Sequence, residues 1–484
     1  MRKLSAAIIA AVSAMIASCT PTPPEATPTG TLPSIYPDYT GVTMPRNICP
    51  PNFMIKQECD RAWAIVSGSS GYSFSTYSSN GKIILDPKSW QKAIEESDSI
   101  AISIITEKDG QRAKYSDFAI YISSCIDPYL TYRRIEPGYE HYTEMGIYQR
   151  CLQSYDERAI IDNSLTNHGC MNCHSFCKQD AGKFLFHLRA EYGATYIVDH
   201  GNIEKLNTKT KNAISNFVYP YWHPDGRYVA FSTNNTQQIF HACDPNRIEV
   251  FDHESDVVVY DVENHKALAP ALLSSKNDME TFPTFSPDGK TLYFCSARNQ
   301  GTMPDSCKKV RYNLMKISFE AGNGSFGGKV DTVINAEKIH KSISLPRISP
   351  DGRWMVFVMM DYGTFSIWHQ EADLYLMDLA TGEYSNITTI NSPRPESYHS
   401  FSSNGEWMVL ASRRDDGLYT RPYITHIDEN GRFSKPFVLP QRDPEYYAVC
   451  LKSFNIPELS KNAVEISQYE ISNAAQNMEA INVK

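Results

Sequence analysis

The chain has 484 residues, of which 42% are hydrophobic, and its 46 basic and 55 acidic side chains give a net charge of −9. A chain of this length is too long for one small core, so we expect two or three domains. The charges are spread along the sequence without a basic stripe, which argues against nucleic acid as a partner.

The N-terminus has the form of a secretory signal. Two basic residues precede an apolar stretch, residues 6–16, that is too short to span a bilayer. The ending Ile-Ala-Ser-Cys19 resembles the lipobox of bacterial lipoproteins, and this resemblance implies removal of residues 1–18 and lipidation of Cys19. It also implies an extracytoplasmic protein anchored to a bacterial membrane, with the periplasmic side of the outer membrane favoured because no acidic run follows Cys19. Ordinary signal cleavage without lipidation is the alternative.

The next two segments differ sharply in composition. Residues 19–34 are rich in Pro and Thr, and they predict an extended tether without a core of its own. In residues 35–165, short alternating hydrophobic runs are separated by turn residues, which predicts a β-sandwich-like domain similar to an immunoglobulin or fibronectin type III module. The helical spacing of Ile147 and Cys151 predicts a terminal helix over residues 146–158.

Residues 166–182 contain the clearest chemical motif of the chain, Cys170-Met171-Asn172-Cys173-His174. The pattern C-x-x-C-H is the attachment signal of a c-type haem. Two thiols three residues apart lie one helical turn apart, so both can reach one edge of a porphyrin, and His174 can bind the iron from the proximal side. We therefore expect one covalent haem c, held by Cys170, Cys173 and His174.

Cys177 leaves other interpretations of this segment open. Together with Cys170, Cys173 and His174 it could form a structural zinc site, although the spacing lacks the second, well-separated pair that is typical of zinc modules. A redox-active C-x-x-C disulfide is a further alternative, but no thioredoxin-like βαβ context is visible. The last alternative is that the C-x-x-C-H pattern occurs by coincidence.

Residues 183–460 repeat one short pattern four times. Each copy has an apolar strand, a turn resembling Ser-Pro-Asp-Gly and a second apolar strand, and the turns contain Gly226, Gly289, Gly352 and Gly405. Asp-Gly and Asn-Gly supply the positive-φ positions that a tight hairpin needs. The hydrophobic residues three and five positions after each glycine share one face of the second strand, so we expect them to pack between sheets.

These repeats resemble those of TolB-like (PD40) β-propellers. The resemblance implies blades of four strands around a funnel that binds peptides or partner proteins. A degenerate blade over residues 184–206 brings the visible count to five, against six in the family, so we expect a five- or six-bladed propeller. Residues 461–484 then form a polar C-terminal tail.

Two histidines depart from the repeat pattern. His399 stands where the other three copies have proline, and His223 stands where the two Ser-Pro-Asp-Gly copies have Ser286 and Ser349. Each is a candidate for the far iron ligand or for a channel-lining contact. For both histidines, the alternative is random sequence variation at a position where the fold accepts many residue types.

The chain is thus predicted to be mainly β, with an N-terminal β-sandwich-like domain, a short haem-motif segment and a propeller. The first functional hypothesis is a membrane-anchored c-type haem protein for electron transfer or redox sensing, with the propeller as a docking platform for a protein partner. The alternative is a protein- or peptide-binding scaffold in which the Cys/His segment is structural, through zinc or a disulfide. An enzyme is the weakest hypothesis, because no G-x-S-x-G elbow is present and no acid/base pair stands out from the repeats. The oligomeric state is left open.

Overall fold

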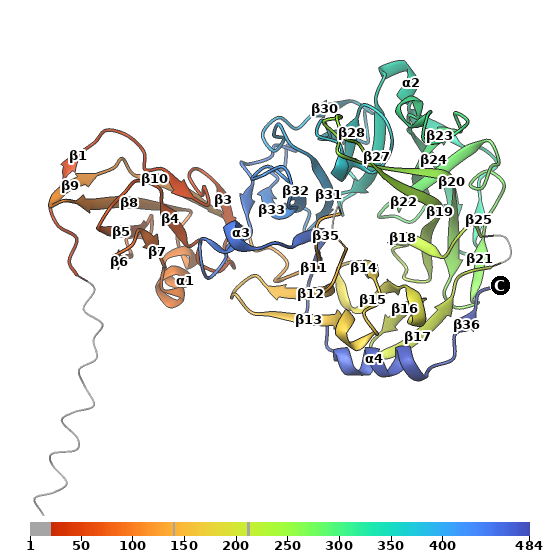
Figure 1. Ribbon diagram of the computed structural model, residues 1–484, viewed down its shortest axis with the longest axis horizontal. Helices are drawn as coiled ribbons and strands as arrows, with labels where there is room; N and C mark the ends of the chain where they lie inside the picture. Colours follow the sequence, from red (N-terminus) through yellow and green to blue (C-terminus); the bar gives the residue numbers. More distant parts are fainter. Residues whose placement is uncertain (1–20, 139–140, 211–212) are drawn as a thin grey trace, which may run out of the picture. The chain divides into compact units, whose positions relative to one another are not determined.

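The computed structural model describes residues 21–138, 141–210 and 213–484, and the chain is mainly β (Figure 1). Cys19 and the predicted signal peptide, residues 1–18, lie outside the described residues. In the part that is described, no helix combines the length and the apolar character needed to cross a membrane. The chain divides into two compact units, which are described separately below.

The first unit takes the described residues up to Gly41, then Pro50–Ile122 and Pro440–Tyr447. One sheet has the order β1-β9-β8-β10, with β5 paired to β8 and β6 paired to β5, and a second sheet has the order β2-β4-β7. The strands are β1 (Thr27–Pro28), β2 (Ile35–Tyr36), β4 (Phe53–Ile55), β5 (Arg61–Gly68), β6 (Ser73–Ser78), β7 (Lys82–Ile83), β8 (Ser99–Lys108), β9 (Gln111–Lys114) and β10 (Phe118–Ser123).

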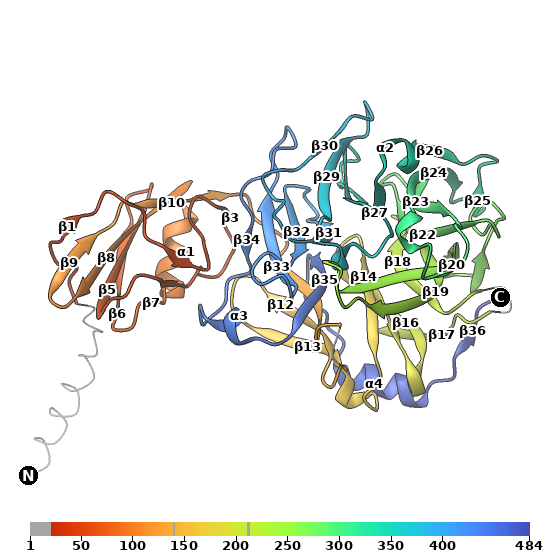
Figure 2. The ribbon, with the colours of Figure 1, turned by 45° about the horizontal axis from the view of Figure 1, so that its top comes forward.

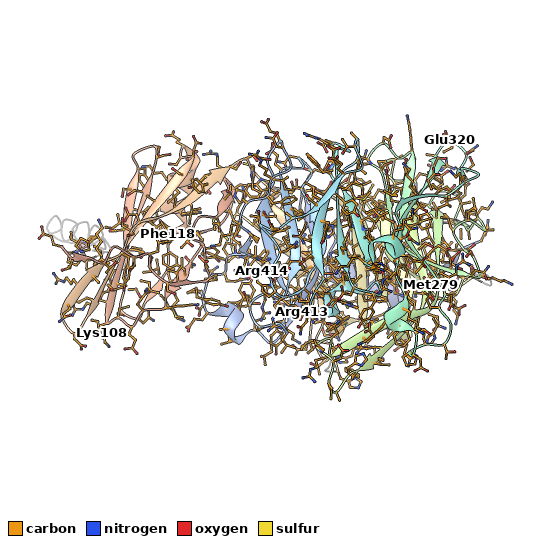
Figure 3. The ribbon with its side chains drawn as sticks, turned by 90° about the horizontal axis from the view of Figure 1, so that it is seen from above. Lys108, Phe118, Met279, Glu320, Arg413 and Arg414 are labelled. Carbon is orange, nitrogen blue, oxygen red and sulfur yellow. The ribbon has the colours of Figure 1, made fainter. Side chains whose placement is uncertain are left out.

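The two sheets of this unit share an apolar interior with one helix. Phe53 of β4 meets Phe118 of β10 (labelled in Figure 3) at a ring distance of 6.0 Å. Helix α1 (Pro87–Glu95), which the sequence analysis did not predict, begins at the N-cap Asp86 and buries Trp90. The predicted tether is partly ordered, because β1 within residues 19–34 pairs in parallel with β9.

The second unit contains six sheets whose innermost strands face one another around a common centre (Figures 1 and 2). The first sheet in chain order has β11 (Tyr129–Ile135), β12 (Gly146–Cys151), β13 (Glu157–Asp162) and β35 (Ser453–Ser460), and the second has β14 (Met171–Cys177), β15 (Asp180–Leu188), β16 (Ala194–Asp199), β17 (Asn202–Asn207) and β36 (Ile481–Asn482). The third has β18 (Phe217–Trp222), β19 (Tyr228–Phe240), β20 (Ile248–Asp261) and β21 (Lys266–Leu268), and the fourth has β22 (Asp278–Phe285), β23 (Thr291–Arg298), β24 (Asn313–Glu320), β25 (Ser325–Phe326) and β26 (Asp331–Ile334). The fifth has β27 (Ser342–Ile348), β28 (Trp354–Met360), β29 (Asp373–Asp378) and β30 (Tyr384–Asn386), and the sixth has β31 (Glu396–Phe401), β32 (Trp407–Ser412), β33 (Arg421–His426) and β34 (Phe437–Val438). The remaining short elements are β3 (Thr43–Pro45), α2 (Ala336–Ile339), α3 (Tyr446–Val449) and α4 (Gln468–Asn477). Six blades of this kind make a β-propeller, and the structure decides between five and six.

The ring of blades is closed by the two ends of the unit. Strand β35, near the C-terminus, pairs antiparallel with β11, so one blade takes its inner strand from the end of the chain and its other strands from the beginning. The helix predicted over residues 146–158 is wrong, because this segment forms β12 and β13 of that blade. Pairing with β11 gives the backbone of β12 its hydrogen bonds, and this tertiary contact overrides a short helical pattern.

The segment predicted to stand between two domains, residues 166–182, is instead the start of a blade. Its β14 is the inner strand, and residues 184–206, which were predicted as a degenerate blade, supply β16 and most of β15 and β17 of the same sheet. The C-terminal tail is also part of this blade. Helix α4 buries Ile471 and Ala475 in the same apolar cluster as Phe184, and β36 extends the sheet beside β17.

The contacts between blades confirm the predicted packing of the repeats. The hydrophobic residues three and five positions after each turn glycine are buried, for example Leu292 and Phe294 in β23. Phe294 lies in one cluster with Phe285 of its own blade and Val257 of the preceding one. Burial of this kind, at about 25 cal/mol per Å² of apolar surface, is the main force holding neighbouring blades together.

Candidate functional site

A cavity of about 410 Å³ lies at the centre of the propeller, and we call it the central chamber. All six innermost strands contribute to its wall, namely β14, β18, β22, β27, β31 and β35. The chamber is therefore built by the whole ring of blades, from segments that lie nearly 300 residues apart in the sequence.

One end of the chamber is lined by a ring of six side chains from equivalent positions, Cys173, Tyr219, Phe282, Leu345, Tyr398 and Ile456. Each inner strand has a register shift here, and five of the six residues have a positive φ between 49° and 56°. Tyr398 is the residue for which no positive φ is found. The shift is a β-bulge, which re-aims the side chains that follow it.

Two positions after this end ring, each inner strand carries a polar residue. We call this set the polar belt: Ser175, Tyr221, Thr284, Arg347, Ser400 and Glu458. The positions are equivalent, because Tyr221, Thr284, Arg347 and Ser400 pair with the fourth residue after the turn glycine of their own blade, Ala230, Tyr293, Val356 and Val409. Five of the six line the chamber, and Thr284 lies fully buried under Arg347.

Contacts within the belt hold its members in place. The Nη1 group of Arg347 donates to Thr284 Oγ1 and to the Pro346 carbonyl, both at 2.8 Å, and its guanidinium lies 5.0 Å from the centre of the Tyr221 ring. Glu458 Oε1 accepts a hydrogen bond from the backbone N–H of Phe176 at 3.0 Å. Burial raises the pKa of Glu458 to about 8, although this hydrogen bond and Arg347 act against it. The chamber therefore contains a fixed cation beside a carboxyl group that stays protonated at neutral pH.

The three residues of the predicted haem site do not converge as thioether attachment requires. Cys170 packs against the apolar cluster that includes Met145 and Ile160, whereas Cys173 lines the chamber. The segment is a strand rather than a helix, so the expectation that the two thiols lie one turn apart is wrong. Thioether attachment needs both thiols at one porphyrin edge, whereas these two thiols lie in different surroundings. The site does not fit a thioether-bound haem, and haem attachment stays a prediction.

His174 lines the chamber but faces the neighbouring blade. Burial lowers the pKa of His174 to about 3, so the ring is neutral, while the backbone at Ile456 and Thr131 partly opposes this shift. Neither ring nitrogen makes a well-formed hydrogen bond to any described residue. Among the three candidate iron ligands, His174 has both ring nitrogens without a hydrogen-bond partner in the described chain, and His399 has one, Nδ1.

The structure separates the two candidate far ligands. His399 lines the chamber, but its Nε2 is engaged with the carbonyl of Val356 at 3.0 Å. His223 is buried outside the chamber wall, where its Nε2 contacts the Gly289 carbonyl at 3.0 Å and its Nδ1 lies 2.7 Å from Asp225. Both histidines thus have structural contacts between or within blades, and of the two only His399 shares the chamber with His174.

The zinc alternative has no geometric support in the described part of the chain. No three His, Cys, Asp or Glu side chains there come close enough together to hold a metal ion. Cys177 packs in a different apolar cluster from Cys170, beside Trp222. All eleven described cysteines have free thiols.

Sequence reasoning missed the polar belt, although the repeats contained a signal for it. In the four aligned copies, the position after the Pro or His is occupied by Tyr221, Thr284, Arg347 and Ser400. The position that follows is uniformly large and apolar, with Trp222, Phe285, Ile348 and Phe401. A position that varies in chemistry between fixed neighbours, and that faces the axis of a propeller, marks a site where each blade contributes something different.

No family model matches the chain, and no curated protein matches it either. Among solved structures, oligogalacturonate lyase from Vibrio parahaemolyticus is similar with 13% identity and a TM-score of 0.36, over 60% of this chain and 70% of the lyase. The β-propeller domain of Cps50 (Swd1) from Myceliophteria thermophila has 8% identity and a TM-score of 0.30, over 54% of this chain and 66% of that domain. A DUF4784 family protein from Bacteroides caccae has 8% identity and a TM-score of 0.32, over 74% of this chain and 96% of that protein. Six sheets around one chamber make this chain a mainly β protein whose larger unit is a β-propeller.

Proposed function

We propose that the propeller is a binding module and that the central chamber is its ligand site. The ligand is a small organic molecule, or the end of a peptide, that fits a cavity of about 410 Å³. Pockets of this size, with apolar walls and a few placed polar groups, are the usual form of such sites.

The polar belt is the observation that carries this proposal. Most of the inner-strand positions serve the fold in the same way in each blade, as bulge residues or as apolar packing between sheets. The belt positions instead combine hydroxyl, phenol, guanidinium and carboxyl groups in one plane of the chamber. Polar groups that differ around the ring are expected where the ring recognises one asymmetric ligand.

The predictions made for the N-terminus belong to the same proposal. Lipidation of Cys19 would hold the propeller at a bacterial membrane outside the cytoplasm, where the chamber samples extracytoplasmic molecules or a protein partner.

Filling the chamber tests the proposal. The mature chain is screened by thermal shift against a set of small acids, sugars and short peptides, and Ser400→Trp is compared with Ser325→Trp, in which the added ring lies on the exposed outer strand β25. We expect compounds that stabilise the wild type and Ser325→Trp but not Ser400→Trp. Equal stabilisation of all three proteins would show that the ligands bind elsewhere, and the chamber would lose its assigned role.

A further inference from the structure

We propose that the chamber recognises an anionic group, a carboxylate or a phosphate, on its ligand and that Arg347 is the residue that binds it. This inference rests on the proposed function, since it defines the chemical class of ligand for the same chamber.

Arg347 is a cation without a carboxylate partner. Its side chain lines the chamber, and no ion pair within 4.0 Å joins its guanidinium to a described Asp or Glu; the acid whose charge acts on it is Glu458 of the same belt. Nη1 is occupied by Thr284 and the Pro346 carbonyl. Nε and Nη2 have no acceptor in the described chain and are not sealed from solvent, so they face the chamber. A charge withdrawn from bulk water with half of its donors unused is costly unless a ligand supplies the acceptors.

The guanidinium is held in a fixed orientation. Thr284 Oγ1 donates to the same Pro346 carbonyl at 2.6 Å, so Thr284, the carbonyl and Nη1 form a closed set of hydrogen bonds on one side of Arg347. The ring of Tyr221 lies against the guanidinium plane. The edge formed by Nε and Nη2 is thereby presented to the chamber, and this edge matches the two oxygens of a carboxylate or phosphate.

The other charged groups of the wall do not neutralise Arg347. Glu458, the acid of the belt, keeps its proton at neutral pH because burial raises its pKa to about 8. It can then act as a hydrogen-bond donor toward an anion. His174 and His399 are neutral at this pH, and Lys178 and Lys461 lie exposed at the end of the chamber opposite the end ring. The wall therefore carries net positive charge.

The apolar part of the wall selects the rest of the ligand. Tyr219 and Phe282 of the end ring lie 4.6 Å apart between ring centres and make one wall aromatic. A ligand that places an anionic head on Arg347 directs its other end toward this ring or toward the exposed lysines. We therefore infer an organic acid or an organic phosphate with a compact apolar body, rather than a free inorganic anion.

Matched probes test this assignment in the mature chain. Benzoate is compared with benzamide, and phenyl phosphate with phenol, by isothermal titration and by thermal shift. We expect the wild type to bind at least one anion ten times or more tightly than its neutral counterpart, and Arg347→Met to lose that preference. The control Arg298→Met removes an exposed arginine whose partner is Asp278, and its preference should equal that of the wild type.

The variants separate a failed ligand assignment from a failed fold or function. Arg347→Lys keeps the charge but not the paired donors, so it should retain a reduced preference, and circular dichroism reports whether either variant is folded. If benzamide binds the wild type as tightly as benzoate does, and phenol as tightly as phenyl phosphate does, the chamber binds ligands but the assignment of an anion subsite is wrong. If no anion binds the wild type, the assignment to Arg347 is overturned whatever the broader screen shows. Preference for benzoate over phenyl phosphate identifies a carboxylate head, and the reverse identifies a phosphate head.

Discussion

The buried carboxyl group of Glu280 predicts how the unfolding free energy of the propeller changes with pH. It lies in β22 with an exposed fraction of 3%, and its Oε2 has no hydrogen-bond partner within the described residues. Burial raises the pKa of Glu280 from 4.5 to about 8, and repulsion from Asp256 and Asp278 adds to this shift. At neutral pH the folded protein therefore holds a proton that the unfolded chain releases.

The size of the effect follows from this difference in proton binding. Because the folded pKa is the higher one, the contribution is fully present below pH 4.5 and is lost as the pH rises toward 8. Each pH unit in this window costs about 1.4 kcal/mol of unfolding free energy, so the loss between pH 4.5 and pH 7 is about 3 kcal/mol. Glu280→Gln does not titrate, and we expect its stability relative to the wild type to rise by that amount over the same interval.

Urea unfolding of the full chain at pH 4.5, 6 and 7 measures the difference. The matched control is Glu383→Gln, which changes an exposed glutamate in a turn and should follow the wild type at every pH. Buried acids that do not interact with Glu280 contribute equally to all three proteins and cancel in the comparison, whereas Asp256 and Asp278 belong to the effect that is measured. If Glu280→Gln and the wild type lose stability in parallel as the pH rises, the reasoning about this buried carboxyl is refuted.

Three further outcomes are expected. Phe294→Ala should lower the unfolding free energy of the propeller by about 3–5 kcal/mol, because it opens a cavity between blades, and a loss below 1 kcal/mol in denaturant titration would contradict the packing described above. Burial lowers the pKa of His369, but its Nδ1 lies 3.1 Å from Glu371 and its Nε2 lies 3.5 Å from Glu249, and these two glutamates raise the pKa to about 9. The stability that this pairing contributes should be full below pH 6.5 and lost as the pH rises through 9, and thermal melts of His369→Gln should show a flatter decline. The chain expressed with the cytochrome c maturation machinery should release any haem on denaturation and show reactive thiols at Cys170 and Cys173, whereas haem retained on the polypeptide would restore the cytochrome hypothesis.

The C-x-x-C-H motif lies in a blade repeat that the sequence analysis did not recognise. Within β14, Cys173 and His174 occupy the positions that Tyr219 and Pro220 occupy in the next blade. Cys173 has the positive φ of the bulge residues in the other blades, and His174 stands where three of them have proline and one has His399 in the repeats aligned from the sequence. The motif thus coincides with a blade repeat too divergent to be recognised from the sequence, and haem attachment stays a prediction.

The local sequence was sufficient to predict those features that depend only on residues adjacent in the chain, namely the turns and the buried faces of the strands. The glycine turns form at the predicted places with positive φ, as at Gly226 and Gly289, because few other residues tolerate that conformation. The hydrophobic residues three and five positions after each turn glycine were enough to place Leu292 and Phe294 between sheets, because every second side chain of a strand points to the same face.

The tertiary structure alone decided the closure of the ring and the composition of the chamber. Strand β35 pairs with β11 across more than 300 residues, and no local periodicity encodes which distant edge a strand will join. That pairing completes the sixth blade, while the pairing of β12 with β11 and β13 turns the predicted helix into strands. It also brings Glu458 into one belt with Arg347, because side chains from six separate segments share a chamber only after the last blade has closed.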